Sequence, residues 1–266
     1  MGEKNFEETD AKRDSGAAGV GFFDLKGRIT RQSGIGPEQA GMLNRRLMLE
    51  LIRRSGGMSR AELSRKTGLT AQATSKIVAR LVEAGYLSEV ARRTGGQGYP
   101  SRVYAINPGG AHSFGATIES NQLTIVMIDL AGHIIAENVT RLKATEPEKV
   151  FIAIRRIAEA QIRTTGIARS ALVGFGLGIP GRYDARHATL IPPTFNPEWQ
   201  NVSVAERLRE VLGIPVFWDN DANAAAIGEC FRGAGVQFQD MLYLHIGRGI
   251  GSGLILSGDA YRGSEG

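Results

Sequence analysis

The chain has 266 residues, of which 42% are hydrophobic and 22% charged, with a formal net charge of +5 and a single cysteine. One cysteine excludes a disulfide framework and indicates a reducing compartment, and no apolar run is long enough to span a membrane, so we predict a cytoplasmic protein. The length suits two domains with a sizeable core. The four histidines are scattered, and the sequence shows no metal site.

The N-terminal part divides at about residue 38. Residues 1–38 mix charges with glycine and serine and lack a sustained hydrophobic period, which predicts a disordered leader. Residues 39–107 are predicted to form a DNA-binding domain. Its first helix is expected to bury one apolar stripe: Leu43, Leu47, Met48, Leu51 and Ile52.

Residues 59–87 predict a helix-turn-helix. Ser59 and Glu62 have the spacing of a capping box, Gly68 permits a sharp turn, and Thr70 can cap the following helix. That helix has a buried stripe on one side and a small, polar and cationic face on the other. We predict that this second face contacts DNA through Thr70, Ala71, Gln72, Ser75, Lys76 and Arg80.

The chemistry of that face suits a DNA groove. Gln72 can read an adenine edge, and Lys76 a guanine or a phosphate. The alternative is a solvated amphipathic helix without a nucleic-acid partner. Charge favours DNA, because residues 44–102 hold twelve Lys or Arg against four Glu, a net charge of +8 that exceeds the +5 of the entire chain.

A wing is predicted beside the two helices. Residues 87–91 and 103–106 look like short strands joined by a loop of glycines and arginines. Arg93 and Arg102 are the wing residues expected to lie along the DNA backbone or the minor groove. Pro108, Gly109 and Gly110 then predict a break between domains.

The remainder, residues 111–266, alternates predicted strands with helices, which indicates an α/β domain. A long helix is expected to start at Thr145, where Glu148 completes a capping box. We expect a glycine loop at residues 247–253, a final hairpin at residues 257–259, and an incomplete domain, because no closing helices follow. The other strands are expected at residues 123–129, 133–140, 172–177, 216–218 and 241–246, and the other helices at 203–212 and 223–231.

Four segments in this order resemble the ROK family of repressors and sugar kinases: GFGLGIPGRYD (174–184), FNPEWQN (195–201), DNDANAAAIGE (219–229) and HIGRGIGSGLILSGDAYRGSEG (245–266). The winged helix-turn-helix joined to them resembles the repressor branch. The resemblance implies an actin-like, hexokinase-like (ribonuclease H-like) sugar-binding domain, here truncated. The family's zinc site would lie beyond Gly266, so no cofactor or metal is assigned.

The resemblance implies that Asn220 and Asp221 contact a sugar, and that Asp221 would be the catalytic base in a kinase. Amide and carboxylate groups at the carboxyl end of a strand can bond neighbouring sugar hydroxyls. The alternative is that Asp221 only caps the following helix. Further residues expected at this cleft are Gly178, Gly181, Asn196 and, as a residue that could equally be solvated, Glu265.

The segments that would bind nucleotide phosphates depart from the kinase pattern. A kinase of this family would carry an Asp-x-Gly-Gly-Thr loop, whose glycines let backbone amides approach the phosphates. That position holds Thr117, Ile118, Glu119, Ser120 and Asn121. A carboxylate at Glu119 would repel phosphate, and Arg248 replaces the threonine of the second loop. We therefore predict that the protein is not an enzyme.

These features predict a transcriptional repressor that binds a double-stranded DNA operator as a homodimer and is released by a monosaccharide or sugar derivative. Two alternatives remain open from the sequence. One is an ATP-dependent sugar kinase fused to a DNA-binding module. The other is a DNA-binding protein whose second domain only dimerises.

Overall fold

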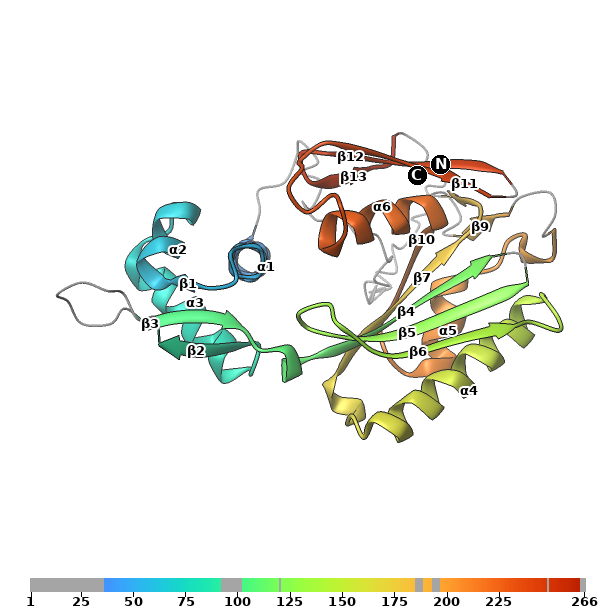
Figure 1. The fold of residues 1–266 in the computed structure, drawn as a ribbon, viewed down its shortest axis with the longest axis horizontal. Coiled ribbons are helices and arrows are strands. Elements are labelled where there is room, and N and C mark those ends of the chain that lie inside the picture. Colours follow the sequence, from blue (N-terminus) through green and yellow to red (C-terminus); the bar gives the residue numbers. More distant parts are fainter. Residues whose placement is uncertain are drawn as a thin grey trace, which may run out of the picture.

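The computed structural model describes residues 36–91, 102–119, 121–184, 189–192, 197–247 and 249–263. Figure 1 shows a small N-terminal domain, from α1 to β3, beside a larger second domain that starts at β4. The predicted leader up to residue 35 lies outside the described residues. So do five residues singled out from the sequence: Arg93, Ser120, Asn196, Arg248 and Glu265.

The N-terminal domain packs three helices against a small antiparallel sheet with the strand order β1-β3-β2. Met48 and Ile52 of the first helix are fully buried, as predicted, but Leu47 is 43% exposed, because α1 buries a narrower stripe than the five-residue pattern indicated. The elements are α1 (Pro37–Ser55), β1 (Met58–Ser59), α2 (Arg60–Thr67), α3 (Ala71–Glu83), β2 (Leu87–Ala91) and β3 (Arg102–Ile106).

Local capping explains where α2 and α3 begin. The Ser59 hydroxyl accepts a hydrogen bond from the Glu62 amide, and the Glu62 carboxylate accepts one from the Ser59 amide at 2.8 Å, which confirms the capping box. Gly68 ends α2 with φ at 69°, a conformation that glycine adopts without strain. The Thr70 hydroxyl caps α3 by accepting from the Ala73 amide at 3.2 Å. The predicted helix-turn-helix is therefore confirmed.

The connection between the domains is packed against the N-terminal domain. The Asn107 amide donates to the Tyr86 carbonyl at 3.0 Å, and its side-chain Nδ2 donates to the Gly85 carbonyl at 2.8 Å. Gly110 lies so close to Gly85 that a Cβ there would be 2.3 Å from the Gly85 oxygen. The chain passes between the domains in the short η1 turn (Pro108–Gly110), and these contacts hold its backbone in place.

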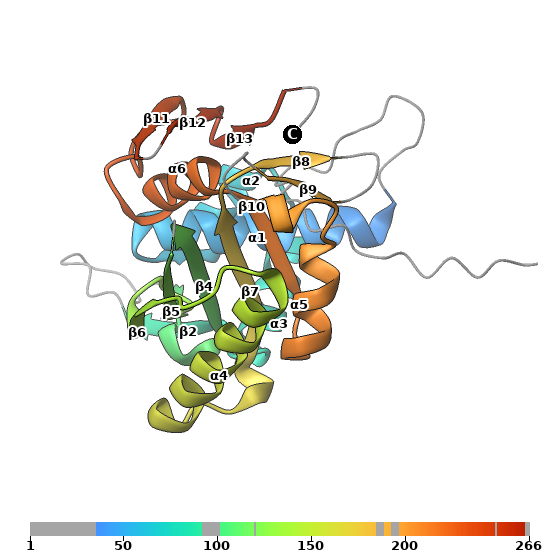
Figure 2. The same ribbon diagram turned by 90° about the vertical axis from the view of Figure 1, so that its right-hand side faces the viewer.

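The second domain is built on a five-stranded sheet with the order β10-β7-β4-β5-β6, in which β4, β7 and β10 are parallel. Helices α4 and α5 cover one face and α6 covers the other, as Figure 2 shows from the side. The strands are β4 (His112–Glu119), β5 (Gln122–Asp129), β6 (Ile134–Arg141), β7 (Leu172–Ile179) and β10 (Val216–Asn220). The helices are α4 (Pro147–Thr165), α5 (Val204–Leu212) and α6 (Asp221–Arg232), with short η2 (Arg169–Ala171) and η3 (Pro197–Trp199) turns.

A second sheet packs on the other side of α6. It has the order β11-β12-β13 and consists of β11 (Met241–Ile246), β12 (Ile250–Leu256) and β13 (Asp259–Tyr261). Gly253 allows the close approach, since a Cβ there would lie 2.5 Å from the Ala226 Cβ of α6. A two-stranded ribbon of β8 (Arg182–Asp184) and β9 (Thr189–Ile191) follows β7.

Strands β4, β8 and β9 were not predicted from the sequence, and three predicted boundaries differ from the structure. Helix α4 begins at Pro147 after Glu146, so Thr145 is not its cap; instead, the Thr145 hydroxyl donates to Glu198 and its carbonyl accepts from the Trp199 indole. Helix α6 begins at Asp221 rather than residue 223, because Asn220 caps it. The expected glycine loop at residues 247–253 is shorter, since β12 already starts at Ile250.

Candidate DNA-binding face and ligand site

The outward face of α3 is exposed and chemically free. Gln72, Lys76 and Arg80 are exposed and Ser75 is half-buried, whereas the opposite stripe of Thr74, Val78 and Leu81 is buried in the domain. Within the described part of the chain, no hydrogen bond or ion pair engages the side chains of Gln72, Lys76 or Arg80. Ala71 is exposed beside them, while Thr70 already uses its hydroxyl as the helix cap. This face can therefore approach a partner without breaking any internal contact.

The wing contributes one described arginine. Arg102 begins β3, its side chain is 74% exposed, and its Nε lies 3.3 Å from a Glu89 carboxylate oxygen on the neighbouring strand β2. Such an exposed pair contributes little to stability and is screened by salt. A DNA phosphate could therefore replace the Glu89 carboxylate as the partner of the Arg102 guanidinium. Its expected DNA contact stays a prediction.

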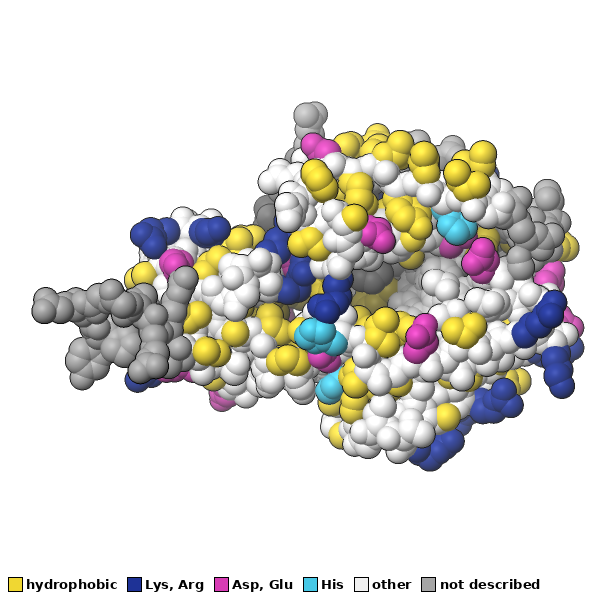
Figure 3. Space-filling model, in the orientation of Figure 1, with side chains coloured by type: hydrophobic (Ala, Val, Ile, Leu, Met, Phe, Trp, Pro, Cys, Tyr) yellow, Lys and Arg dark blue, Asp and Glu magenta, His cyan; other side chains and the backbone are white. Residues whose placement is uncertain are grey.

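The candidate ligand site lies where the parallel strands β4, β7 and β10 end. Gly178 on β7 is the meeting point: a Cβ there would be 3.4 Å from the Thr117 Cγ2 of β4 and 3.6 Å from the Asp221 Cα of α6. The carboxyl edge of a parallel sheet is where ligands of α/β domains bind. Figure 3 shows the surface hollowed between the five-stranded sheet and the layer formed by α6 with its second sheet.

Asn220 and Asp221 have different roles at this edge. Asn220 caps α6, because its Oδ1 accepts from the Ala222 and Asn223 amides, and its Nδ2 donates to the Gly181 carbonyl at 2.9 Å. Asp221 is half-buried and accepts from the Ala222 amide through Oδ1, while among the described residues nothing donates to its Oδ2. Asp221 is thus not the helix cap, and one of its oxygens is available to a ligand hydroxyl.

Two residues that the sequence prediction missed support this edge. The Asp219 carboxylate pairs with Arg262 at 2.6 Å, with both side chains only 11% exposed, and it accepts from the Asn223 side chain at 3.1 Å. Arg262 follows β13, so this ion pair ties the end of β10 to the second sheet. Asp219 lies inside the DNDAN motif, but its distant partner could not be identified from local sequence.

Packing accounts for the glycines predicted to line the cleft. Gly181 has φ at 134°, and a Cβ there would lie 2.6 Å from Leu190 Cδ1 and 2.7 Å from the Ile191 oxygen. A Cβ on Gly178 would lie 3.2 Å from the Ala224 Cβ, so the close approach of β7 to α6 favours glycine there. Whether either glycine also touches a ligand stays a prediction.

The two expected phosphate loops lie against each other. A Cβ on Gly247, at the turn between β11 and β12, would be 3.5 Å from the Glu119 Oε1 at the end of β4. An acidic oxygen therefore stands beside the backbone that would cradle a phosphate. In the described ranges, no group of three or more His, Cys, Asp or Glu side chains gathers where it could hold a metal ion. No described helix is long and apolar enough to cross a membrane.

Known proteins match both parts of the chain. Residues 114–266 match the ROK family and residues 43–98 the MarR family. The xylose repressor of Bacillus subtilis is 27% identical over 84% of this chain and 58% of its own length. A ROK family transcriptional regulator, described as a homologue of the Escherichia coli MLC protein, has a structure that aligns with a TM-score of 0.70 and 21% identity over 85% of this chain and 57% of its own.

A kinase is also similar to the second domain. The ROK family glucokinase of Streptomyces griseus, solved with glucose and AMPPNP, aligns with a TM-score of 0.51 and 27% identity over 59% of this chain and 48% of its own. The chain spans little more than half the length of the curated relatives that it matches. The predicted architecture, a winged helix-turn-helix followed by an actin-like, hexokinase-like α/β domain, is confirmed as far as the chain extends. Because the family match covers more than half of its residues, this chain belongs to the ROK family.

Proposed function

We propose that the protein is a sugar-responsive transcriptional repressor that reads a double-stranded DNA operator with α3. The observation that carries this proposal is the outward face of α3, where Gln72, Lys76 and Arg80 are exposed and form no hydrogen bond or ion pair with the described residues. A recognition helix needs such free donors to bond base edges and phosphates. The local net charge of +8 over residues 44–102 adds the electrostatic attraction that supplies much of DNA affinity.

A homodimer suits this task, because one recognition helix reads too few base pairs for specificity. Two copies related by a two-fold axis would present two α3 helices to a palindromic site, about one helical turn of DNA apart. Such a protein would work in the cytoplasm, at the nucleoid when bound to DNA.

The effector is proposed to be a monosaccharide bound at the carboxyl edge of the five-stranded sheet. The Oδ2 of Asp221, which has no donor among the described residues, supplies an acceptor for a sugar hydroxyl, while Asn220 and Asp219 hold the start of α6 in place. D-Xylose is the first sugar to test, because a related protein is a xylose repressor. The sugar can act only if it binds two arrangements of the protein with different affinity.

A sugar kinase is the second candidate, favoured by the similarity to a glucokinase. In a kinase, Asp221 would accept the proton of the attacking hydroxyl. Glu119 beside Gly247 counts against it, since an acidic oxygen there opposes bound phosphate. We expect no ATP turnover with D-glucose or D-xylose. Sugar-dependent turnover that Asp221→Asn abolishes would establish the kinase instead.

The test is a salt-dependent titration of the protein with DNA from upstream of its own gene, followed by fluorescence anisotropy. We expect the logarithm of the affinity to fall with the logarithm of salt by about 0.9 per neutralised phosphate. D-Xylose or D-glucose should release the DNA, and D-sorbitol should not. Equal affinity for this DNA and for an unrelated duplex would contradict operator recognition. Specific binding that no sugar changes would contradict the effector role.

A further inference from the structure

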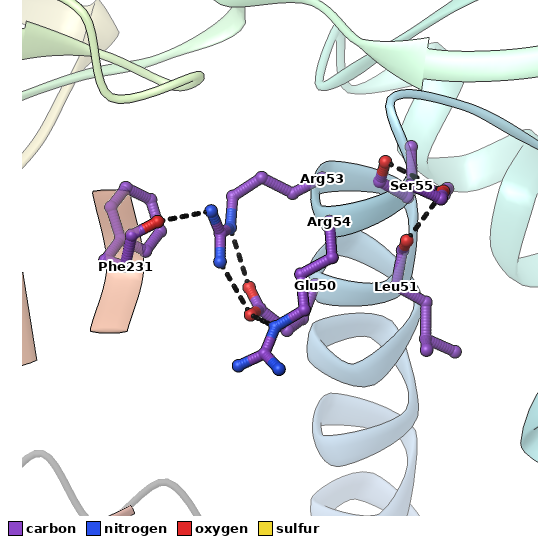
Figure 4. Close-up of polar contacts among 7 residues, drawn as sticks. Glu50, Leu51, Arg53, Arg54, Ser55 and Phe231 are labelled. Carbon is purple, nitrogen blue, oxygen red and sulfur yellow. Dashed lines mark hydrogen bonds and ion pairs between the residues drawn. The ribbon is translucent and has the colours of Figure 1, made fainter. Parts of the chain in front are cut away.

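The two domains touch where α6 ends. Arg53, near the carboxyl end of α1, donates from Nη1 to the Phe231 carbonyl of α6 at 2.6 Å, and its guanidinium carbon lies 4.1 Å from the centroid of the Phe231 ring. Figure 4 shows the side chain reaching from one domain to the other. A cation stacked on an aromatic ring and bonded to a backbone oxygen makes a directional contact between the domains.

Arg53 is held in this orientation by its own helix. Its Nε and Nη2 donate to the two oxygens of Glu50 at 2.9 and 2.7 Å, and the Arg53 side chain is only 14% exposed. Arg54 donates to the same carboxylate at 2.6 Å. Burial alone would raise the pKa of Glu50, but the hydrogen bonds from both arginines lower it. Glu50 is therefore ionised at neutral pH and fixes the guanidinium that faces Phe231.

The acceptor is equally constrained. The carbonyls of the last helical turn lack partners within the helix and carry the negative end of its dipole, so a cation is favoured there. Phe231 also packs on the turn between β5 and β6, where a Cβ on Gly132 would be 2.8 Å from the ring. Arg232 donates to the Ala131 carbonyl of that turn at 3.1 Å. A shift of the whole of α6 against the large sheet would therefore move the carbonyl oxygen that Arg53 bonds.

The same helix starts at the candidate ligand site. Asn220 and Asp221 lie at its amino end, and its 12 residues give a rod of about 18 Å. In the described chain, the N-terminal domain is held at the packed connection around Asn107 and at Arg53. If the Arg53 contact is lost, the N-terminal domain can rotate about the connection at Asn107. In a dimer, such a turn changes the spacing between the two α3 helices, which an operator reads.

We propose that α6 transmits the state of the ligand site to the DNA-binding domain, with the Arg53 contact on Phe231 as the coupling element. The inference rests on the proposed function, because it explains how that site would control operator affinity. A displacement of about 1 Å at the end of α6 lengthens a 2.6 Å hydrogen bond beyond the usual limit. A small sugar-induced shift is thus enough to break the contact.

The test compares Arg53→Met with Arg54→Met. Both variants lose one arginine of α1 that bonds Glu50, but of these two arginines it is Arg53 that bonds the Phe231 carbonyl and stacks on its ring. For each protein, operator affinity is measured with and without D-xylose and with D-glucose, and sugar affinity is measured by calorimetry without DNA. We expect wild type and Arg54→Met to lose about tenfold or more in operator affinity when sugar is added. In Arg53→Met, the operator affinities measured with and without sugar should be about equal, while calorimetry still shows that the sugar binds.

Phe231→Leu is the second variant, and it leaves the residues of the DNA-binding domain intact should Arg53→Met fail to bind the operator. It removes the stacked ring and keeps the backbone carbonyl, so we expect a smaller loss of coupling. The double variant that combines Arg53→Met with Phe231→Leu should behave like Arg53→Met alone, because both changes act on one contact. Release equal to wild type in both single variants would overturn the inference and leave the proposed function standing. A wild type that no sugar releases would instead overturn the proposed function.

Discussion

The face of α3 and the edge of the large sheet differ in how their polar residues are used. Gln72, Lys76 and Arg80 on α3 point away from the domain without internal partners in the described structure. At the sheet edge, both the Oδ1 and the Nδ2 of Asn220 form hydrogen bonds within the protein, and Asp219 is buried in an ion pair. The exposed side chains of the α3 face contribute no described polar contact to their own domain, whereas the polar side chains of the sheet edge help to hold their domain together.

This difference predicts how substitutions act. Changes on the α3 face should alter binding and leave the free energy of unfolding unchanged. Changes at the sheet edge should alter stability first, and any effect on a ligand should come through the shape of the edge. Among the described residues of this edge, Asp221, whose Oδ2 has no donor there, is the one expected to combine a small structural cost with a direct loss of ligand binding.

The largest effect is expected from reversing a charge on α3. Lys76→Glu should weaken operator binding by more than about tenfold, because it removes a DNA contact and repels phosphate in each half-site. Thermal unfolding should be unchanged, since Lys76 has no partner within the described structure. Fluorescence anisotropy with labelled operator measures the loss.

Arg155→Glu is the control for net charge. Arg155 is an exposed residue of α4 in the second domain, and its substitution changes the total charge by the same amount. Its operator affinity should stay within about twofold of wild type at physiological salt, because charges farther apart than about 8 Å are screened. Equal losses in both variants would mean that total charge, and not the α3 face, carries the binding.

The next largest effect is expected at Gly181. An alanine there needs φ at 134° and places its Cβ 2.6 Å from Leu190 and 2.7 Å from the Ile191 oxygen. We expect Gly181→Ala to lower the free energy of unfolding by about 2 kcal/mol, which urea denaturation would measure. The control is Gly228→Ala in α6, where nothing lies within 4 Å of the new Cβ. It should stabilise by about 0.5–1 kcal/mol, because alanine favours a helix interior. A change of the same sign in the free energy of unfolding of both variants would contradict this explanation.

The same contrast explains what the sequence could predict. The helix-turn-helix follows from signals only a few residues apart, such as Ser59 with Glu62 and Gly68 between two helices. The order of strands and helices in the second domain also follows from local hydrophobic periods. Both depend on neighbours in the chain. The helix-turn-helix is confirmed, whereas the order predicted for the second domain lacked strands β4, β8 and β9.

Contacts between distant residues could not be predicted in this way. The pairs of Arg53 with Phe231 and of Arg262 with Asp219 join residues 178 and 43 positions apart. No local period marks such a partner. The cap of α6 was missed for a related reason. Asn220 and Asp221 both favour that position, and the sequence does not show that Asn220 also bonds the Gly181 carbonyl, 39 residues away.

A smaller effect is expected at that cap. Asn220→Ala should cost about 1–2 kcal/mol, because it removes the acceptor of the Asn223 amide, one of the two acceptors of the Ala222 amide, and the donor to the Gly181 carbonyl. Asn220→Ser keeps a side-chain acceptor for the helix and should recover about 1 kcal/mol of that loss. The midpoints of urea unfolding compare the two variants. Equal destabilisation by both would show that capping is not what Asn220 contributes.

The smallest effect is expected from Glu50, a residue of the DNA-binding domain that lies at the junction and is engaged like those of the sheet edge. Arginine hydrogen bonds hold its pKa below the usual value of about 4.5, against the effect of burial. The ionised form therefore stabilises the folded protein above that value, and the contribution is lost as pH falls through the lowered pKa. Glu50→Gln does not titrate, so its deficit against wild type should be present at pH 6 and shrink towards pH 3. A deficit that is independent of pH would mean that Glu50 acts by packing, and Arg53 would then be oriented by something other than this charge.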